Sequence, residues 1–441
     1  MTKKLWGGRF SKETDPLVEE FTKSVHYDHK LARYDILGSI LHVQVLKKAK
    51  YLSPKEAAKL TMALDSLYKA TVRGVFKYDA KAEDIHTDIQ NKLEAKVGDL
   101  ALKLHTARSR NEQVVLATKV YCKVELAGLI ADLAAVEETL AKLSKKNEDM
   151  VIPGFTHMQH AQPVYLKDYL GAYIRMFERD RARLASISNN IELTMGAGAL
   201  AGTPIPSAKY NVSIQGLKIK SAVNSIDAVS DRDFVIEILS ALAICGVHLS
   251  RLGEDLIIWS TKEFDFVEID DAFCTGSSLM PHKKNADVLE LIRGYAGHLN
   301  GNLISVLTMM KGLPLSYNRD MQLDKEPLFN SIETVSMSLK VLSRLIGTIK
   351  FKKVRIEAYL EDESLYATDL VYYLVDKGVP FKTAHAIVGR LVRYSLDNKI
   401  EIKSMSEAEL HKFSDKFKSQ QILKLFNPKA SVDSKRSIAR R

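Results

Sequence analysis

A loop rich in hydroxyl groups and positive charge interrupts the second half of the chain. It reads Gly276-Ser-Ser-Leu-Met-Pro-His-Lys-Lys-Asn285, so Ser277 and Lys283 lie close together in sequence. The loop is followed by an apolar stretch, and the N–H groups at the start of a helix favour an anion. The pattern is typical of a carboxylate or phosphate site, although an ordinary polar linker has the same composition.

A second candidate segment runs from Pro153 to Pro163 and places Thr156 next to His157. A histidine beside a hydroxyl group is a candidate general acid or base, although a loop histidine is more often structural. His157 and His160 could suggest a metal pair, but no cysteine or carboxylate cluster completes it. We therefore expect no metal.

Two further polar segments precede long apolar stretches. Thr106–Asn111 brings together two guanidinium groups, a hydroxyl group and an amide, which suits a carboxylate ligand but also fits a helix cap with solvated arginines. Tyr317–Pro327 is polar throughout and is, by itself, consistent with a turn before a capped helix. No glycine-rich phosphate loop precedes a strand, so nucleotide binding is unsupported.

The formal charge of +10 and the pI of about 9.1 fit either a basic soluble protein or an anionic ligand drawn by a positive field. We find no signature of a helix-turn-helix, a zinc module or an RNA-binding motif, and so expect no nucleic-acid partner. The basic end, Lys435–Arg441, is interpreted as a solvated tail.

Five long helical segments form the middle of the chain, because apolar residues recur there at helical spacing and breaks are few. Pro163 is expected to open the second, a Ser230/Asp233 capping box the third, and Asn285 to cap the fourth. The expected spans are Asn111–Lys146, Pro163 to about Thr194, about Ser230 to Phe264, Ala286–Lys311, and about Asp324–Lys350.

These spans predict an all-α protein with a long five-helix central bundle between two smaller helical domains. The expected domains are residues 1–105, 106–354 and 355–441. Helices of about 40–50 Å present more apolar face than one bundle can cover, which favours oligomerisation.

The three cysteines, Cys122, Cys245 and Cys274, are far apart and suggest neither a disulfide framework nor a metal site. The N-terminus lacks the apolar core of a signal peptide. The apolar run Ile238–Ser250 is too short to span a bilayer, so we expect no membrane segment and a cytoplasmic protein.

Taken together, the four polar segments resemble the argininosuccinate lyases of the fumarase/aspartase superfamily. The loop Gly276–Asn285 fits the superfamily signature, and Tyr317–Pro327 discriminates most strongly for the narrower family. The match is extended by Leu5–Phe10, Ser109–Asn111, Thr156-His157, Asp227–Phe234, Ala367–Leu370 and Gly378–Phe381. The chain departs from the family's usual residues at four positions, where Ala107, Glu112, His160 and Ala286 replace Gly, Asp, Arg and Pro.

The resemblance implies a fumarase/aspartase-like fold and a reversible β-elimination that splits argininosuccinate into L-arginine and fumarate, the last step of arginine biosynthesis. It implies no cofactor. It also implies a homotetramer whose active sites are shared between chains. That agrees with the roughly 50 Å of helix expected between Asn111 and His157, at about 1.5 Å per residue.

The resemblance also assigns roles to individual residues. Ser277 is the implied base and His157 the implied acid, although these two roles could be reversed. Lys283 and Asn285 would stabilise the aci-carboxylate intermediate, and Glu290 would orient or charge His157. The residues implied for the fumarate half are Ser109, Asn111 and Thr156, and those for the arginine half are Ser24, Tyr317, Gln322 and Lys325. Weaker matches add Arg110, Asp84 and His86.

Three other functions remain as alternatives. Another lyase of the superfamily, such as adenylosuccinate lyase, disagrees with the segment Gln322–Lys325, and a substrate panel would decide. A structural crystallin of this family should have lost site residues, which are all present here. A basic scaffold or nucleic-acid binder would reveal itself by salt-dependent binding.

Overall fold

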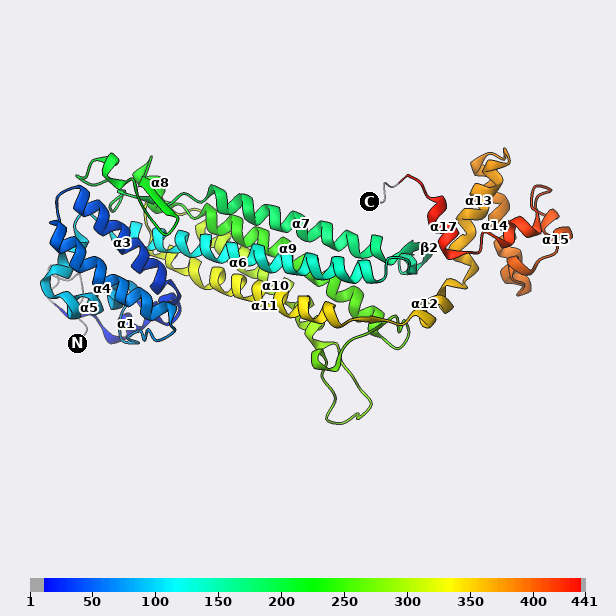
Figure 1. Cartoon of the computed structure of the whole chain (residues 1–441), viewed down its shortest axis with the longest axis horizontal. Coiled ribbons are helices and arrows are strands. Elements are labelled where there is room, and N and C mark those ends of the chain that lie inside the picture. Colours follow the sequence, from blue (N-terminus) through cyan, green and yellow to red (C-terminus); the bar gives the residue numbers. More distant parts are fainter. Residues whose placement is uncertain (1–11, 438–441) are drawn as a thin grey trace. The chain divides into compact units, whose positions relative to one another are not determined.

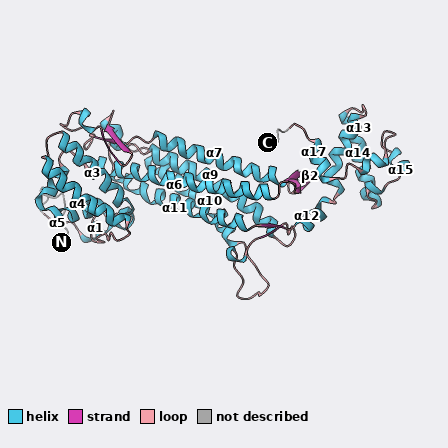
Figure 2. Ribbon diagram, viewed as in Figure 1, coloured by secondary structure: helices cyan, strands magenta, loops and turns pink. Residues whose placement is uncertain are grey.

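The computed structural model describes residues 12–437, so the Leu5–Phe10 match and the last four residues lie outside the described part. The fold is mostly helical, with short strands between helices (Figure 2), and the predicted all-α class is confirmed. The chain divides into two compact units. Unit 1 holds the chain up to Leu133, Arg179–Val247 and Gly294–Ser338, and unit 2 holds Ala134–Glu178, His248–Arg293 and Leu339 onward. The predicted three-domain division stays a prediction.

Five long helices form the middle of the chain, as predicted (Figure 1). The boundary between the two units crosses each of these helices, so each helix has one part in unit 1 and one in unit 2. In unit 1, Ser336 Oγ donates to Asp132 Oδ2 at 2.7 Å, which joins α11 to α6. In unit 2, Tyr173 donates to Arg251 O at 3.2 Å, which joins α7 to α9. The bounds are α6 Arg110–Lys146, α7 Leu166–Asn190, α9 Asp233–Ser260, α10 Asp287–Met310 and α11 Lys325–Thr348.

Shorter helices in unit 1 position several of the predicted site residues. α3 is buried along most of its length and packs against α4 and α5. α5 begins at Asp84, whose Oδ1 accepts the Thr87 N–H at 2.6 Å and so caps the helix. The bounds are α1 Pro16–Thr22, α2 Val25–Asp28, η1 His29–Leu31, α3 Ala32–Lys48, α4 Pro54–Val72, α5 Ile85–Val97, η2 Gly98–His105, η3 Ser207–Tyr210, α8 Ser225–Ser230 and η5 Arg319–Asp324.

The C-terminal helices of unit 2 enclose a core of their own, which includes Leu370, Val388 and Phe417. Lys435 Nζ donates to Asp369 Oδ1 at 2.7 Å, so the basic end begins with an anchored residue rather than a solvated one. The bounds are α12 Lys353–Leu360, η6 Glu363–Tyr366, α13 Ala367–Asp376, α14 Phe381–Asn398, η7 Ile402–Ser404, α15 Glu407–His411, α16 Ser419–Leu423 and α17 Pro428–Ser434, with η4 Asp271–Phe273 earlier in the same unit.

The strands form small sheets between the helices. β1 Val151–Thr156 and β2 Gln159–Tyr165 make an antiparallel hairpin. β3 Thr194–Met195, β5 Leu217–Ser221 and β4 Val212–Ile214 form a sheet in that order, and β6 Val267–Glu268 pairs with β7 Lys350–Phe351. The prediction that Pro163 opens a helix is wrong, because Pro163 lies in β2 opposite Pro153. Proline suits the first helical position, but it also tolerates a strand position that needs no N–H donor.

Two predicted helix caps are also wrong. Ser230 ends α8, where its hydroxyl group donates to Ile226 O at 2.8 Å, and the Asp231 carboxylate instead accepts the Asp233 N–H that begins α9. Asn285 forms a β-bridge with Thr275. α10 begins only at Asp287, so Ala286 precedes it, and Ala286 O accepts the N–H groups of Leu289 and Glu290. At α9 a neighbouring carboxylate therefore reaches the free N–H group that the predicted cap was expected to satisfy.

α9 is the one helix among residues 12–437 that is long and apolar enough to cross a membrane, and 56% of its most apolar window is buried. It is longer than the predicted run Ile238–Ser250. Its Gly246 lies against Leu299 of α10, where an added Cβ would be 2.5 Å from a leucine methyl group. A helix that packs this closely against its neighbour has the properties of a core helix, which passes the same test of length and composition.

Candidate active site

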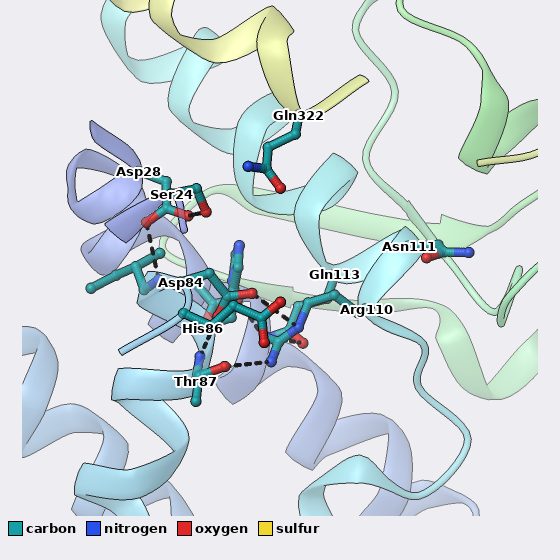
Figure 3. A network of polar contacts seen from close by, with 12 residues as sticks. Ser24, Asp28, Asp84, His86, Thr87, Arg110, Asn111, Gln113 and Gln322 are labelled. Carbon is teal, nitrogen blue, oxygen red and sulfur yellow. Dashed lines mark hydrogen bonds and ion pairs between the residues drawn. The ribbon is translucent and has the colours of Figure 1, made fainter. Parts of the chain in front are cut away.

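A buried polar network in unit 1 gathers residues from separate segments of the chain (Figure 3). Ser24 Oγ donates to Asp28 Oδ2 at 2.6 Å, and Asp28 Oδ1 accepts the Ile85 N–H at 3.0 Å. Ser24 N also donates to Glu83 O at 2.8 Å. Burial raises the pKa of Asp28. The charge of His86 and the hydrogen bonds that Asp28 accepts from Ser24 and Ile85 oppose this rise. These contacts fix Ser24, which was predicted to bind the arginine half, against the start of α5.

Arg110 connects this network to the start of α6. Its Nη2 donates to Thr87 Oγ1 at 3.2 Å, its Nη1 donates to Gln113 Oε1 at 3.3 Å, and its Nε lies 3.5 Å from Asp84 Oδ2. Burial alone would raise the pKa of Asp84, but Arg110 and His86 outweigh it and hold that pKa below its usual range. The weaker predictions Asp84, His86 and Arg110 therefore fall in one cluster.

Next to the network lies a contact between a carboxylate and an imidazole that the sequence did not reveal. Asp35 Oδ1 accepts Gln113 Nε2 at 2.8 Å and lies 2.9 Å from His86 Nδ1. Burial would raise the pKa of Asp35, but His86, Arg108 and Gln113 together lower it to about 2. Arg108 Nη1 donates to Ser39 at 2.9 Å, so this arginine turns inward rather than into solvent. Asp35 stands within the apolar helix α3 and belongs to no motif.

The start of α6 carries the predicted fumarate-half residues Ser109 and Asn111. Ser109 Oγ accepts the Asn111 N–H at 3.2 Å, and Glu112 Oε1 accepts the Ser109 N–H at 3.3 Å. Asn111 Nδ2 donates to Ala199 O at 3.3 Å, on a side away from the network of Figure 3. Burial raises the pKa of Glu112, while backbone N–H groups that include Gly196 and Ser109 oppose the rise.

Gln322 and Tyr317 lie close to the same network. Gln322 Nε2 donates to Thr22 O at 3.2 Å, two residues before Ser24, and its side chain points toward the network in Figure 3. Arg319 Nη2 donates to the same carbonyl group at 2.9 Å. Burial raises the pKa of Tyr317, while the charges of Arg232 and Arg319 lower it. The structure therefore brings Gln322 close to the segment that carries Ser24.

Lys325 is more deeply buried than a ligand-binding lysine needs to be. Its side chain is 4% exposed, and its Nζ donates to Asp324 Oδ1 at 2.8 Å and to Met321 O at 3.4 Å. Asp324 Oδ2 accepts Arg232 Nε at 2.7 Å. Arg232, from the motif Asp227–Phe234, thus supports the segment that carries Lys325, a function that the sequence did not indicate.

In unit 2, Thr156 and His157 lie at the tip of the β1–β2 hairpin and are exposed. His157 and Met158 form its two-residue turn, with φ angles of +54° and +59°. Such turns favour Gly and Asn, because a side chain is strained in the left-handed region. The segment predicted as a loop is therefore a strained hairpin tip that presents His157 outward.

The loop between η4 and α10, yellow-green in Figure 1, is closed at its base by the Thr275–Asn285 bridge. Ser277 Oγ accepts the N–H groups of Leu279 at 3.2 Å and Met280 at 3.0 Å. The two lysines of this loop differ in their environment. Lys284 Nζ binds Glu268 at 2.6 Å and Asp271 at 2.7 Å, which raises its pKa, whereas the side chain of Lys283 is exposed.

The structure of the single chain does not bring the predicted acid, His157, into polar contact with the predicted base or with Glu290. Among residues 12–437, no hydrogen bond or ion pair joins His157 to Ser277 or to Glu290. His160, the departure from arginine, binds Asp362 through Nδ1 and packs edge-on to Phe155. Within the described residues 12–437, no group of three or more His, Cys, Asp or Glu side chains is arranged so that it could bind a metal ion.

Comparisons with known proteins cover nearly the whole chain. The family described as Lyase matches residues 8–301, and the family described as Argininosuccinate lyase C-terminal matches residues 364–433. Argininosuccinate lyase of Ruminiclostridium cellulolyticum is 45% identical over 415 residues, which cover 94% of this chain and 90% of that protein. The enzyme of the same name from Geobacter sp. is 43% identical and covers 98% and 95% of the two chains.

Solved structures agree on the fold. An EDDS lyase variant with bound fumarate matches with a TM-score of 0.78 at 22% identity and covers 96% of this chain and 89% of that one. The class II fumarase of Schistosoma mansoni matches with a TM-score of 0.77 at 15% identity, covering 92% and 91%. At such identities these two likenesses concern the fold alone. The near-complete match to the relatives above shows that the chain belongs to the argininosuccinate lyase family.

Proposed function

We propose that this protein is an argininosuccinate lyase, which splits argininosuccinate reversibly into L-arginine and fumarate in the last step of arginine biosynthesis. One observation carries the proposal beyond family membership. Four separate segments, around Ser24, Asp84, Arg110 and Gln322, converge on one polar network. Three of them carry a residue predicted to bind substrate, and the fourth carries the weaker match Asp84. The reaction needs no cofactor, because the carboxylate beside the cleaved bond can hold the developing charge.

In this proposal, the loop Gly276–Asn285 provides the base and the electrostatic stabilisation. Ser277 removes the proton next to the carboxylate, and the two N–H groups that it already accepts favour negative charge on its oxygen. Lys283 and Asn285 stabilise the aci-carboxylate. His157 protonates the departing guanidinium nitrogen, and Glu290 orients or charges His157. The reversed roles of Ser277 and His157 fit the same geometry.

The remaining predicted residues hold the substrate. The fumarate half is held by Ser109, Asn111 and Thr156. The arginine half is held by Ser24, Tyr317 and Gln322, and Arg110 of the same network also binds substrate. Lys325 is kept in the second set, because an ammonium group has three donors and two are used by Asp324 and Met321. Its third donor is the one that we assign to a substrate carboxylate.

We further propose that the enzyme is a cytoplasmic homotetramer with active sites shared between chains. Support comes from α10, which carries no charged residue from Gly294 to Met310. On the same stretch the side chains of Ile304 and Leu307 are 60% and 41% exposed. An apolar helix face that is open in one chain is typical of a protein–protein interface.

The experiment that tests the proposed activity is a direct assay. Purified protein is mixed with argininosuccinate, and fumarate is followed by its ultraviolet absorbance, with adenylosuccinate as the alternative substrate. We expect fumarate to form from argininosuccinate and not from adenylosuccinate. If argininosuccinate gives no fumarate while adenylosuccinate does, the proposal is wrong.

A further inference from the structure

A glycine-rich segment of unit 1, residues 196–202 between β3 and η3, has a conformation that other residues would not adopt. Gly196, Gly198 and Gly202 have φ angles of +95°, +60° and +83°. A Cβ added to Gly198 would lie 2.6 Å from Gly202 O, and one added to Gly196 would lie 2.8 Å from the Tyr210 ring. The backbone of this segment is therefore tightly constrained, and its N–H groups have fixed directions.

Glu112 binds this segment with one carboxylate. Its Oε2 accepts the N–H groups of Gly196 at 2.8 Å and Ala197 at 3.0 Å, while its Oε1 accepts the Ser109 N–H at 3.3 Å. Glu112 is 3% exposed. A carboxylate that accepts three backbone donors in a buried place joins the start of α6 firmly to the glycine-rich segment.

Asn111 is held by the same segment, because its Nδ2 donates to Ala199 O at 3.3 Å. Only the NH₂ side of a carboxamide can face a carbonyl oxygen, so this contact sets which way the amide points. One N–H group and the Oδ1 of Asn111 are then left for a ligand. The direction of this amide therefore depends on where Glu112 holds the segment.

We propose that Glu112 is a positioning residue that orients the Asn111 carboxamide toward the fumarate half of the substrate. The inference rests on the proposed function, in which Asn111 binds that half. It assigns a purpose to one of the four departures from the family pattern. The carboxylate of Glu112 extends one methylene further from the helix than the usual aspartate would, and here it reaches both sets of donors.

The most informative substitution is Glu112→Gln, which keeps the shape of the side chain. An amide has a single oxygen, so it can serve either the segment or Ser109, and its NH₂ group then faces the other donors. Glu112→Asp keeps the charge but shortens the reach. Glu125→Gln is the matched control, because Glu125 lies on the same helix and accepts a hydrogen bond from Tyr34 at 2.5 Å, away from the glycine-rich segment.

The readouts are the separate inhibition constants of fumarate and arginine, together with hydrogen exchange at Gly196 and Ala197. For Glu112→Gln we expect the fumarate constant to rise about tenfold or more. The arginine constant should stay unchanged, and the two amides should exchange faster. Glu112→Asp should also raise the fumarate constant and not the arginine constant, but by a smaller factor. If the glutamine variant does not fold, the aspartate variant is used for the test. Glu125→Gln should match the native protein.

Two results would overturn the positioning of Asn111. One is a fumarate constant that is unchanged in Glu112→Gln and Glu112→Asp. The other is an equal loss for fumarate and arginine, which a general structural defect would produce. If the native protein failed to cleave argininosuccinate, the proposed function would fail instead. Calorimetric fumarate binding and hydrogen exchange would still test the positioning.

Discussion

At the scale of single residues, the environment of Ser277 decides whether its hydroxyl group can act as a base. A serine alkoxide is too unstable at neutral pH unless nearby groups favour its negative charge. Ser277 Oγ already accepts N–H groups from Leu279 and Met280, and Lys283 follows within the same loop. Hydrogen bonds to the charged form lower a pKa, so the loop is suited to this task before any substrate binds.

The first prediction concerns this hydroxyl group. Ser277→Ala should lower kcat by about 10²–10⁴-fold, the usual contribution of an acid or base, and should leave substrate binding nearly unchanged. Steady-state kinetics and calorimetric binding of argininosuccinate measure the two effects. The neighbouring Ser278→Ala is the control, since it removes an exposed hydroxyl group from the same loop. Near-native turnover of Ser277→Ala would exclude Ser277 as the base.

The second prediction concerns Lys325, which contributes to both binding and stability if the proposal is right. Lys325→Ala should weaken argininosuccinate binding by about 1.5–3 kcal/mol, because a desolvated charge-assisted contact is lost. It should also lower the free energy of unfolding, since Asp324 loses one of its two cationic partners. Calorimetric binding and denaturant unfolding separate the effects. Reduced stability with an unchanged dissociation constant would make Lys325 a purely structural residue.

At this scale, a residue could be predicted from the sequence where it belonged to a motif or matched a residue of the family. Arg110 and Gln322 were found by their segments and Ser24 by the family resemblance, and the structure brings them to one network. Asp35 was missed, because a charged residue within an apolar helix reveals its partner only after folding. The role of Arg232 was missed, because its contact with Asp324 joins residues 92 positions apart. Glu112 was visible as a departure, but its contact with Gly196 joins residues more than eighty positions apart.

At the scale of elements, periodicity predicted the long helices well and the segments between them poorly. α6 and α11 begin within a residue of the expected positions. The helix expected from Pro163 exists as α7, but it begins only at Leu166, because the segment around Pro163 pairs with β1 and strand pairing depends on residues beyond the local pattern. The consequence matters for function, since the hairpin places His157 at an exposed, left-handed turn position that a helix or loop would not impose.

The third prediction tests what holds this hairpin. Asp362 precedes η6 and binds His160 of β2. Burial would raise the pKa of Asp362, but hydrogen bonds from His160 and Ser364 outweigh it and lower that pKa. A lowered folded pKa means that the ionised group stabilises the protein above the unfolded value of 3.8. That stabilisation is lost as pH falls through the folded value.

Asp362→Asn should therefore lower the free energy of unfolding at pH 7, by at most about 1 kcal/mol because the pair is partly exposed. The difference from the native protein should shrink as pH falls below 3.8. Thermal unfolding across pH measures it. Asp149→Asn, which breaks the exposed Asp149–Lys429 pair, is the control and should have little effect. A deficit that grows on acidification would contradict the assigned sign.

At the scale of the whole molecule, the length of α6 limits where a complete site can form. Ser109 and Asn111 stand at its first turn, and Thr156 and His157 follow its last one. A straight helix of these 37 residues would be about 55 Å long at about 1.5 Å per residue. A substrate that must touch both motifs is far shorter than this. If both motifs serve one site, we expect them to come from different chains.

The open apolar face of α10 gives those chains a surface on which to associate. Ile304 and Leu307 lie on a stretch without charge, and Met337 of α11, also in unit 1, is 63% exposed. Burying such faces between chains stabilises an oligomer by about 25 cal/mol for each Å² of apolar surface removed from water. A symmetric oligomer would repeat every composite site once for each chain.

The last prediction is that two inactive variants restore activity when they share an oligomer. Asn111→Leu disables the first motif and His157→Ala the second, and each alone should be inactive after refolding. When the two are unfolded, mixed and refolded together, a site built from different chains can take its intact first motif from one variant and its intact second motif from the other. With random assembly about a quarter of the sites are complete, and turnover should recover to about that fraction. A site made within one chain would carry a defect in every case. Hybrid oligomers verified by mass and still inactive would therefore exclude shared sites.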